Sequence, residues 1–110
     1  MNPEIKNEWT AALRSGQYIR GTGQLIIDNG NIVKHCCLGV LCEVVNRHLD
    51  EKCDIYGSYP SGTIIKTAGL SEFDPRVPFG EEKNLKHLSD LNDNLGVSFT
   101  EISDLIEKNL

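Results

Sequence analysis

The sequence lacks the features that mark a membrane protein or a secreted protein. Its apolar runs are only a few residues long, far short of the roughly 20 residues that cross a bilayer as a helix. The first ten residues, MNPEIKNEWT, include two acidic residues and no apolar core of a signal peptide. We therefore expect no membrane association and a cytosolic protein, in which cysteine thiols stay reduced.

Positive charge is also scarce. The 110 residues include 11 Lys and Arg against 16 Asp and Glu, which gives a formal net charge of -5 at pH 7. Because contacts to the phosphate backbone dominate the affinity for duplex nucleic acid, we expect no duplex partner. The few arginines of the N-terminal half could still hold a compact anion.

Four cysteines are present, and three of them lie in the stretch HCCLGVLCEVV, residues 35–45. Their spacing does not match the paired knuckles of structural zinc sites, so we expect no metal ligand and no cofactor. The alternative is a reactive thiol at Cys36 or Cys37, near a helix start, but only His35 or His87 could act as its base. Because free cysteine is among the most buried residue types, we favour core packing and assign no catalytic residue.

Helical and strand periodicity are clear in the first half. A good N-cap, a proline at the first helical position and apolar spacing predict a helix over residues 2–15. β-Branched runs flanking the turn sequence DNGN, residues 28–31, predict a β-hairpin over residues 24–35. Residues 37–48 then have the spacing of an amphipathic helix, in which Gly39 lets another backbone approach closely.

The second half is less regular. Residues 51–82 are rich in Gly, Pro, Ser and Asp, and we interpret them as an irregular, loop-rich insertion and a candidate ligand lid. Within it only TIIK, residues 63–66, reads as a strand, followed by a short turn of helix at 68–70. Leucines at four-residue and three-residue steps predict a helix over 85–95, and a capping box at 98–101 begins a last helix.

These elements predict an α+β fold. We expect about four helices around a small antiparallel β-sheet, in a single compact domain that spans residues 1–110.

Three segments carry a resemblance. WTAALRSGQYIRGTGQL (residues 9–25), CCLGVLCEV (36–44) and LSDLNDNLGVSFTEISDLIE (88–107) resemble, in this order and spacing, small proteins encoded by tailed phages and prophages. Their motifs are ALRSGxYxxGxGxL, CCLGVLC and LNDxxGxSFxxI. The resemblance implies a phage origin and a place in the cytosol of the host cell. Arg20 stands where family members often have glutamine, and Ile26 where many have arginine, so the ligand can differ.

A candidate ligand site surrounds the glycines of RSGQYIRGTG. Arginines, hydroxyls and exposed backbone amides at one turn suit a phosphate or carboxylate, and tyrosines in a loop can stack on a ring. The structural alternative is a helix end followed by a connecting loop, with the arginines solvated or paired to Asp93, and with Asn92 and Asp93 satisfying backbone groups. The candidate ligand-binding residues are Arg14, Arg20, Gly21, Thr22, Gly23, Tyr56, Tyr59, Asn92 and Asp93.

The function that we favour at this point is non-enzymatic binding. A homo-oligomer would hold a small anionic, nucleotide-like ligand and, given a phage origin, could sequester a nucleotide signal of host immunity. Two alternatives stay open. One is a small hydrolase or transferase that uses a cysteine or a carboxylate, and the other is a protein inhibitor that presents its acidic C-terminal helices to a host target.

Overall fold

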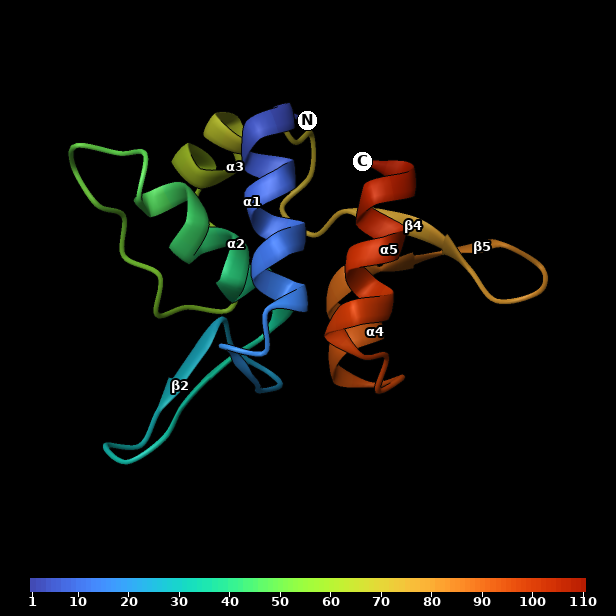
Figure 1. Ribbon diagram of the computed structural model, residues 1–110, viewed down its shortest axis with the longest axis horizontal. Coiled ribbons are helices and arrows are strands. Elements are labelled where there is room, and N and C mark those ends of the chain that lie inside the picture. The colour runs from blue at the N-terminus through green and yellow to red at the C-terminus, as the bar shows by residue number, and fades with distance from the viewer.

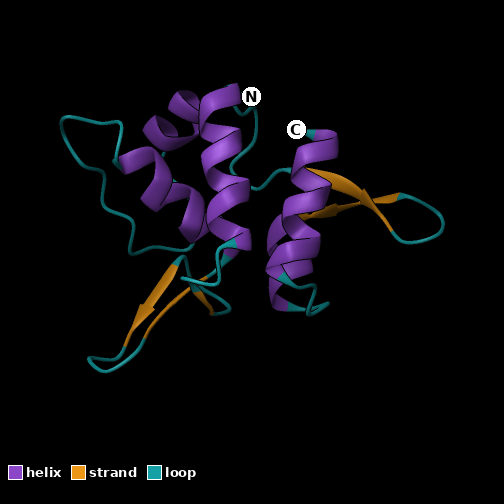
Figure 2. Cartoon of the chain, in the orientation of Figure 1, coloured by secondary structure: helices purple, strands orange, loops and turns teal.

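The chain folds into five helices and two small β-sheets, which confirms the α+β class (Figures 1 and 2). The computed structural model describes residues 1–110 as one compact domain. The helices are α1 (Pro3–Arg14), α2 (Cys37–Asn46), α3 (Gly62–Ala68), α4 (Leu88–Asp93) and α5 (Phe99–Asn109). The strands are β1 (Ile19–Arg20), β2 (Ile26–Asp28), β3 (Val33–His35), β4 (Arg76–Phe79) and β5 (Asn84–His87).

Helix α1 lies in the middle of the molecule, with α2 and α3 on one side and α5 on the other (Figure 1). The side chain of Asn2 accepts hydrogen bonds from the first free amides of the helix, at 2.9 and 3.2 Å, as the sequence predicts. Trp9 on its inner face is fully buried, and its indole N–H donates to the carbonyl oxygen of Cys37 at 2.9 Å. The first helix is thereby joined to the start of α2.

The predicted hairpin at residues 24–35 is confirmed. Strands β2 and β3 pair in antiparallel register, and Gly30 takes a positive φ of 91° in the turn between them. Strand β1 adds to the other edge of β3, where Ile19 faces Lys34 in parallel register. The antiparallel pairing that the sequence predicts holds for β2 and β3, and β1 makes the sheet mixed. The two-residue β1 is too short to leave a strand pattern in the sequence.

Helix α2 is the core helix that the sequence predicts, and Gly39 is the reason that the hairpin packs against it so closely. A Cβ atom added at Gly39 would lie only 2.0 Å from the carbonyl oxygen of Leu25, just before β2. The same oxygen accepts a hydrogen bond from the amide of Cys36 at 3.0 Å. Both Cys37 and Cys42 are fully buried, in line with their predicted packing role.

The structure corrects the prediction for the middle of the chain. TIIK is not a strand but part of α3, where Ser61 caps the helix start and Gly69 ends it in the left-handed conformation, with φ at 73°. The predicted loop-rich insertion, residues 51–82, contains both α3 and β4. Its longest stretch without a helix or strand is residues 51–61. Four apolar-rich residues do not distinguish a strand from a buried helical turn, which explains the error.

The predicted helix over residues 85–95 is also too long. Leu85 belongs to β5, which forms a hairpin with β4 through a turn at residues 80–83, and its side chain is 58% exposed. Helix α4 begins only at Leu88, so the structure has five helices and a second sheet. The last helix begins at its predicted cap, Ser98, whose hydroxyl accepts a hydrogen bond from the amide of Glu101.

No helix of the chain combines the length and the hydrophobicity that a bilayer crossing requires, and the longest, α1, has 12 residues. The two ends of the chain lie close together, because the amino group of Met1 donates to the carbonyl oxygen of Leu110 at 3.3 Å.

The close contact at Gly39 can be tested by substitution. Gly39→Ala must displace the Leu25 carbonyl, and we expect a loss of about 2 kcal/mol or more in the free energy of unfolding. The matched control is Gly62→Ala, also helical, where an added Cβ meets nothing within 4 Å and no loss is expected. Urea denaturation of both variants measures the difference, and equal stabilities would contradict this packing.

Candidate functional site

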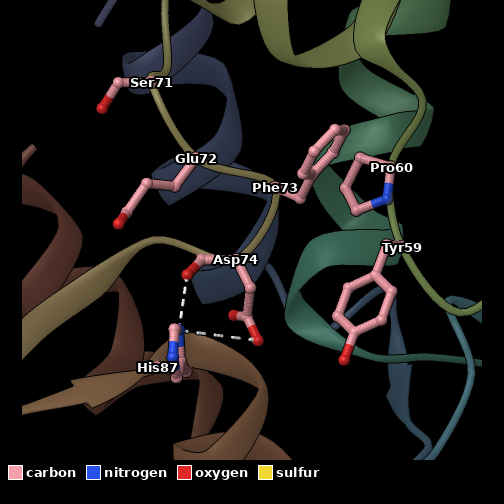
Figure 3. A pocket seen from close by; sticks show the side chains of 7 residues that line it. All are labelled: Tyr59, Pro60, Ser71, Glu72, Phe73, Asp74 and His87. Carbon is pink, nitrogen blue, oxygen red and sulfur yellow. Dashed lines mark hydrogen bonds and ion pairs between the residues drawn. The ribbon is translucent and has the colours of Figure 1, made fainter.

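Three adjoining hollows on the surface meet at the side chain of Tyr59. Their volumes are about 610, 510 and 210 Å³. The largest is shown in Figure 3, where the Tyr59 ring faces Asp74 and His87 across the open space. We call the three together the Tyr59 groove. Its lining consists of Gly23, Gln24, Cys36, Leu38, Ser58, Tyr59, Pro60, Ser71, Glu72, Phe73, Asp74, Leu85, Lys86, His87, Ser89, Asp90, Asp93 and Asn94.

Asp74 organises the wall opposite Tyr59. One carboxylate oxygen accepts the amide of Ser89 at 3.0 Å, and the other accepts its hydroxyl. Helix α4 has no side-chain cap from its own N-cap residue, His87, so Asp74 stabilises the helix start instead. The carboxylate is therefore held in one position by two donors.

The imidazole of His87 is oriented by the same segment. Its Nδ1 lies 2.7 Å from the carbonyl oxygen of Asp74, which can only accept, so Nδ1 carries the proton. The Asp74 carboxylate lies 3.9 Å from Nδ1 (Figure 3). Nε2 forms no hydrogen bond within the protein. It is available for a hydrogen bond with a ligand in the groove.

No hydrogen bond joins a hydroxyl or a thiol of the groove to a histidine. The hydroxyl of Ser89 donates to Asp74 and not to His87. At the narrow end of the groove the Cys36 thiol accepts a hydrogen bond from the amide of Gly39 at 3.3 Å, and burial raises its pKa above the ordinary value. Burial likewise raises the pKa of Cys42, to about 12. All four cysteines are free, and the Cys36 thiol forms no hydrogen bond to a histidine or a carboxylate.

The predicted glycine loop is held by side chains of α4. Asn92 is fully buried, and its amide group donates to the carbonyl oxygen of Gly21 at 2.9 Å while its oxygen accepts the amide of Cys37 at 3.2 Å. Asp93 accepts the amide of Gly23 at 3.1 Å. Asn92 and Asp93 therefore satisfy backbone groups, as the structural alternative expects. These backbone groups belong to the glycine loop and to the start of α2. The alternative pairing with an arginine was wrong.

The two arginines of the predicted site do not line the groove. Arg14 bridges to α5, where its guanidinium donates to Asp104 at 2.7 Å and to Glu107 at 2.6 Å, and these hydrogen bonds raise its pKa. Arg20 donates to the carbonyl oxygen of Val97 at 2.9 Å and forms no ion pair. Each arginine thus has its own partners elsewhere in the protein, and the anion-binding site expected around both side chains stays a prediction.

Of the nine candidate residues, three line the Tyr59 groove: Gly23, Tyr59 and Asp93. Tyr56 is 68% exposed. Neither Tyr56 nor Thr22 lines any of the three hollows. The sequence did not point to Asp74 or Ser89, because the β4–β5 hairpin that brings their segments together was not recognised.

The fold and the groove define a small α+β domain with an open, partly aromatic surface site. The whole chain, residues 1–110, matches the family described as Domain of unknown function (DUF8296), and the protein belongs to that family. No curated protein and no solved structure matches the chain. The phage origin that the motifs imply stays a prediction.

His35, at the end of β3, is a buried titratable group outside the groove. Its carbonyl oxygen accepts a hydrogen bond from the amide of Gly21 in the glycine loop. Its ring packs edge-on against Tyr18, with 4.8 Å between ring centroids, and Nδ1 is buried without a hydrogen-bond partner. Burial lowers the pKa of His35 below the ordinary value of 6.5, and the weaker attraction of Glu43 opposes this shift.

The lowered pKa of His35 predicts acid sensitivity. Between the folded-state pKa and 6.5 the unfolded chain binds more protons, so stability is complete above pH 6.5 and falls as pH decreases through that range. His35→Phe keeps the contact with Tyr18 but cannot titrate. Urea midpoints from pH 7.5 to 5 should fall more steeply for the wild type than for this variant, and parallel curves would contradict the assignment.

The role of Asn92 predicts a large loss of stability on substitution. Asn92→Leu has a similar size but leaves the Cys37 amide and the Gly21 carbonyl without partners, which should cost about 2–4 kcal/mol. Asn94→Ala removes an exposed amide two residues later and should change stability by about 0.5 kcal/mol or less. Calorimetric melting of both variants distinguishes them, and a mild effect at Asn92 would refute its role.

Proposed function

We propose that the protein is a non-enzymatic binding protein that holds the planar ring of a small, nucleotide-like ligand in the Tyr59 groove. The observation that carries the proposal is the meeting of three hollows at one exposed aromatic side chain, with oriented polar groups on the facing wall. Concave sites with aromatic surface and a few fixed polar groups are typical of small-molecule binding.

The apolar part of the groove suits a ring. Tyr59 and Phe73 are 59% and 57% exposed, and Pro60 lines the same hollow (Figure 3). Large exposed aromatic side chains beside a hollow leave apolar area that a stacked ligand would cover. Stacking of a base on an aromatic side chain contributes about 1–3 kcal/mol and tolerates different bases.

The polar part of the groove suits hydrogen-bond donors rather than phosphate. Asp74, Asp90 and Asp93 line the middle hollow, together with a single lysine, Lys86, and with His87. Carboxylates accept from the amino and imino groups of a base but repel a phosphate. The base would lie in the groove and any phosphate outside it, so the negative charge expected of the ligand contributes little here.

The state of the polar groups favours binding over catalysis. The hydroxyl and thiol nucleophiles of covalent enzymes are commonly hydrogen-bonded to a histidine that acts as the base, and no such pair is present in the groove. In the groove the hydroxyl of Ser89 is bound to Asp74, and the Cys36 thiol has a raised pKa and accepts from a backbone amide. With the phage origin that the motifs imply, sequestration of a host signalling nucleotide is the specific role that we propose.

Paired tyrosine variants test this site. Wild type, Tyr59→Ala and Tyr56→Ala are titrated calorimetrically with nucleosides, their cyclic monophosphates and cyclic dinucleotides. Tyr59→Ala should weaken the best ligand by about tenfold or more, whereas Tyr56→Ala should leave its affinity unchanged, because only Tyr59 lines the groove. Removal of the ligand's phosphate should change the affinity by less than about tenfold.

The fate of the ligand separates binding from the alternatives. The complex is heated and the released molecule is analysed by mass spectrometry. An intact ligand supports the proposal, whereas a chemically changed product would show an enzyme. Absence of binding across the whole panel would favour a protein partner, and equal losses in both tyrosine variants would place the site elsewhere.

A further inference from the structure

Three side chains with metal-ligating atoms converge away from the Tyr59 groove. Glu4 and Glu8 lie one turn apart on α1, and His48 follows the end of α2. One ligand atom from each lies within 4.8 Å of those of the other two. His48 Nε2 lies 2.5 Å from a carboxylate oxygen of Glu8. This group is the only one of three or more His, Cys, Asp or Glu side chains in the chain with such spacing.

An ion pair accounts for only part of this cluster. His48 pairs with Glu8, but Glu4 forms no ion pair, and no lysine or arginine pairs with either carboxylate. Two carboxylates four residues apart on a helix repel each other. The positive end of the helix dipole favours Glu4 in the first turn, but it does not bring an imidazole nitrogen from another element to the same point.

The chemistry of the donors identifies the kind of ion. Imidazole nitrogen suits zinc and its neighbours, whereas calcium and magnesium prefer oxygen ligands alone. One histidine and two carboxylates leave at least one coordination position for water in a tetrahedral arrangement. The partly exposed position of Glu8 and His48 allows an ion to enter from solvent.

We propose that Glu4, Glu8 and His48 form a binding site for a divalent transition-metal ion of the zinc type. The ion joins the first two turns of α1 to the end of α2 and neutralises the two facing carboxylates. Because the three ligands come together only in the folded chain, binding stabilises the fold. The site does not depend on the Tyr59 groove or on its ligand.

Thermal unfolding with zinc chloride tests the proposal. The full chain with Cys53→Ser, which removes the most exposed of the four cysteines, serves as the reference protein. Saturating Zn²⁺ should raise its Tm by about 5 °C or more, and the same concentration of Mg²⁺ should not. Glu8→Gln and His48→Gln should each lose the Zn²⁺ shift. Glu101→Gln, which removes a carboxylate from the first turn of α5, should keep it.

Cobalt spectroscopy gives a readout that does not depend on stability. Co²⁺ bound by one nitrogen and carboxylate oxygens has visible d–d bands and no sulfur-to-metal charge-transfer band. The proposal is supported if these bands are present in the reference protein and absent in His48→Gln. It is overturned by a sulfur band, by bands that persist in His48→Gln but are lost in His87→Gln, by equal Zn²⁺ shifts in all variants, or by no shift.

Discussion

The buried amide of Asn92 is the constraint on which most of the structure depends. It is fully buried, so both its donor and its acceptor need partners inside the protein. Its partners are the first amide of α2 and a carbonyl of the glycine loop, segments that are 55 and 71 residues away in the sequence. One side chain therefore fixes α4 against the core helix and against the loop before β2.

Position and orientation of the groove follow from this constraint. Helix α4 is held near its end by Asn92, and its start is held by Asp74, which accepts both the amide and the hydroxyl of Ser89. The wall that carries His87, Ser89 and Asp93 is thus fixed at both ends. Fixed polar groups favour binding because little entropy is lost in ordering them around a ligand.

The sequence predicted those elements whose signals are local. The cap at Asn2, the turn at Gly30 and the hydroxyl cap at Ser98 each act within a few residues, and each is confirmed. The close approach at Gly39 was also correctly inferred, because glycine inside an otherwise apolar helix has a strong steric meaning. The two caps and the turn depend only on residues within one or two turns, whereas the partner of Gly39, Leu25, lies on another segment.

The predictions were wrong where contacts between distant parts of the sequence determine the start of a helix or the partner of a side chain. The leucine spacing predicted a helix that begins at Leu85. In the structure Leu85 pairs with β4 as part of β5, and the cap from Asp74 lets the helix begin only at Leu88. Arg14 was assigned to a ligand because of the glycines that follow it, although its partners lie on α5, 90 and 93 residues later. Of the predicted site residues, Tyr59, Gly23 and Asp93 line the groove, whereas the positions of Asp74 and His87 there depend on the missed hairpin.

The opposite wall of the groove is coupled to the core through a short chain of backbone contacts. The segment that carries Tyr59 is bound to the sheet where the amide of Leu25 donates to the carbonyl of Gly57 at 2.9 Å. The carbonyl of Leu25 in turn lies over Gly39 and accepts the amide of Cys36. Residue 25 therefore links the start of α2 to the segment that carries the tyrosine, and the absence of a side chain at Gly39 makes room for this link.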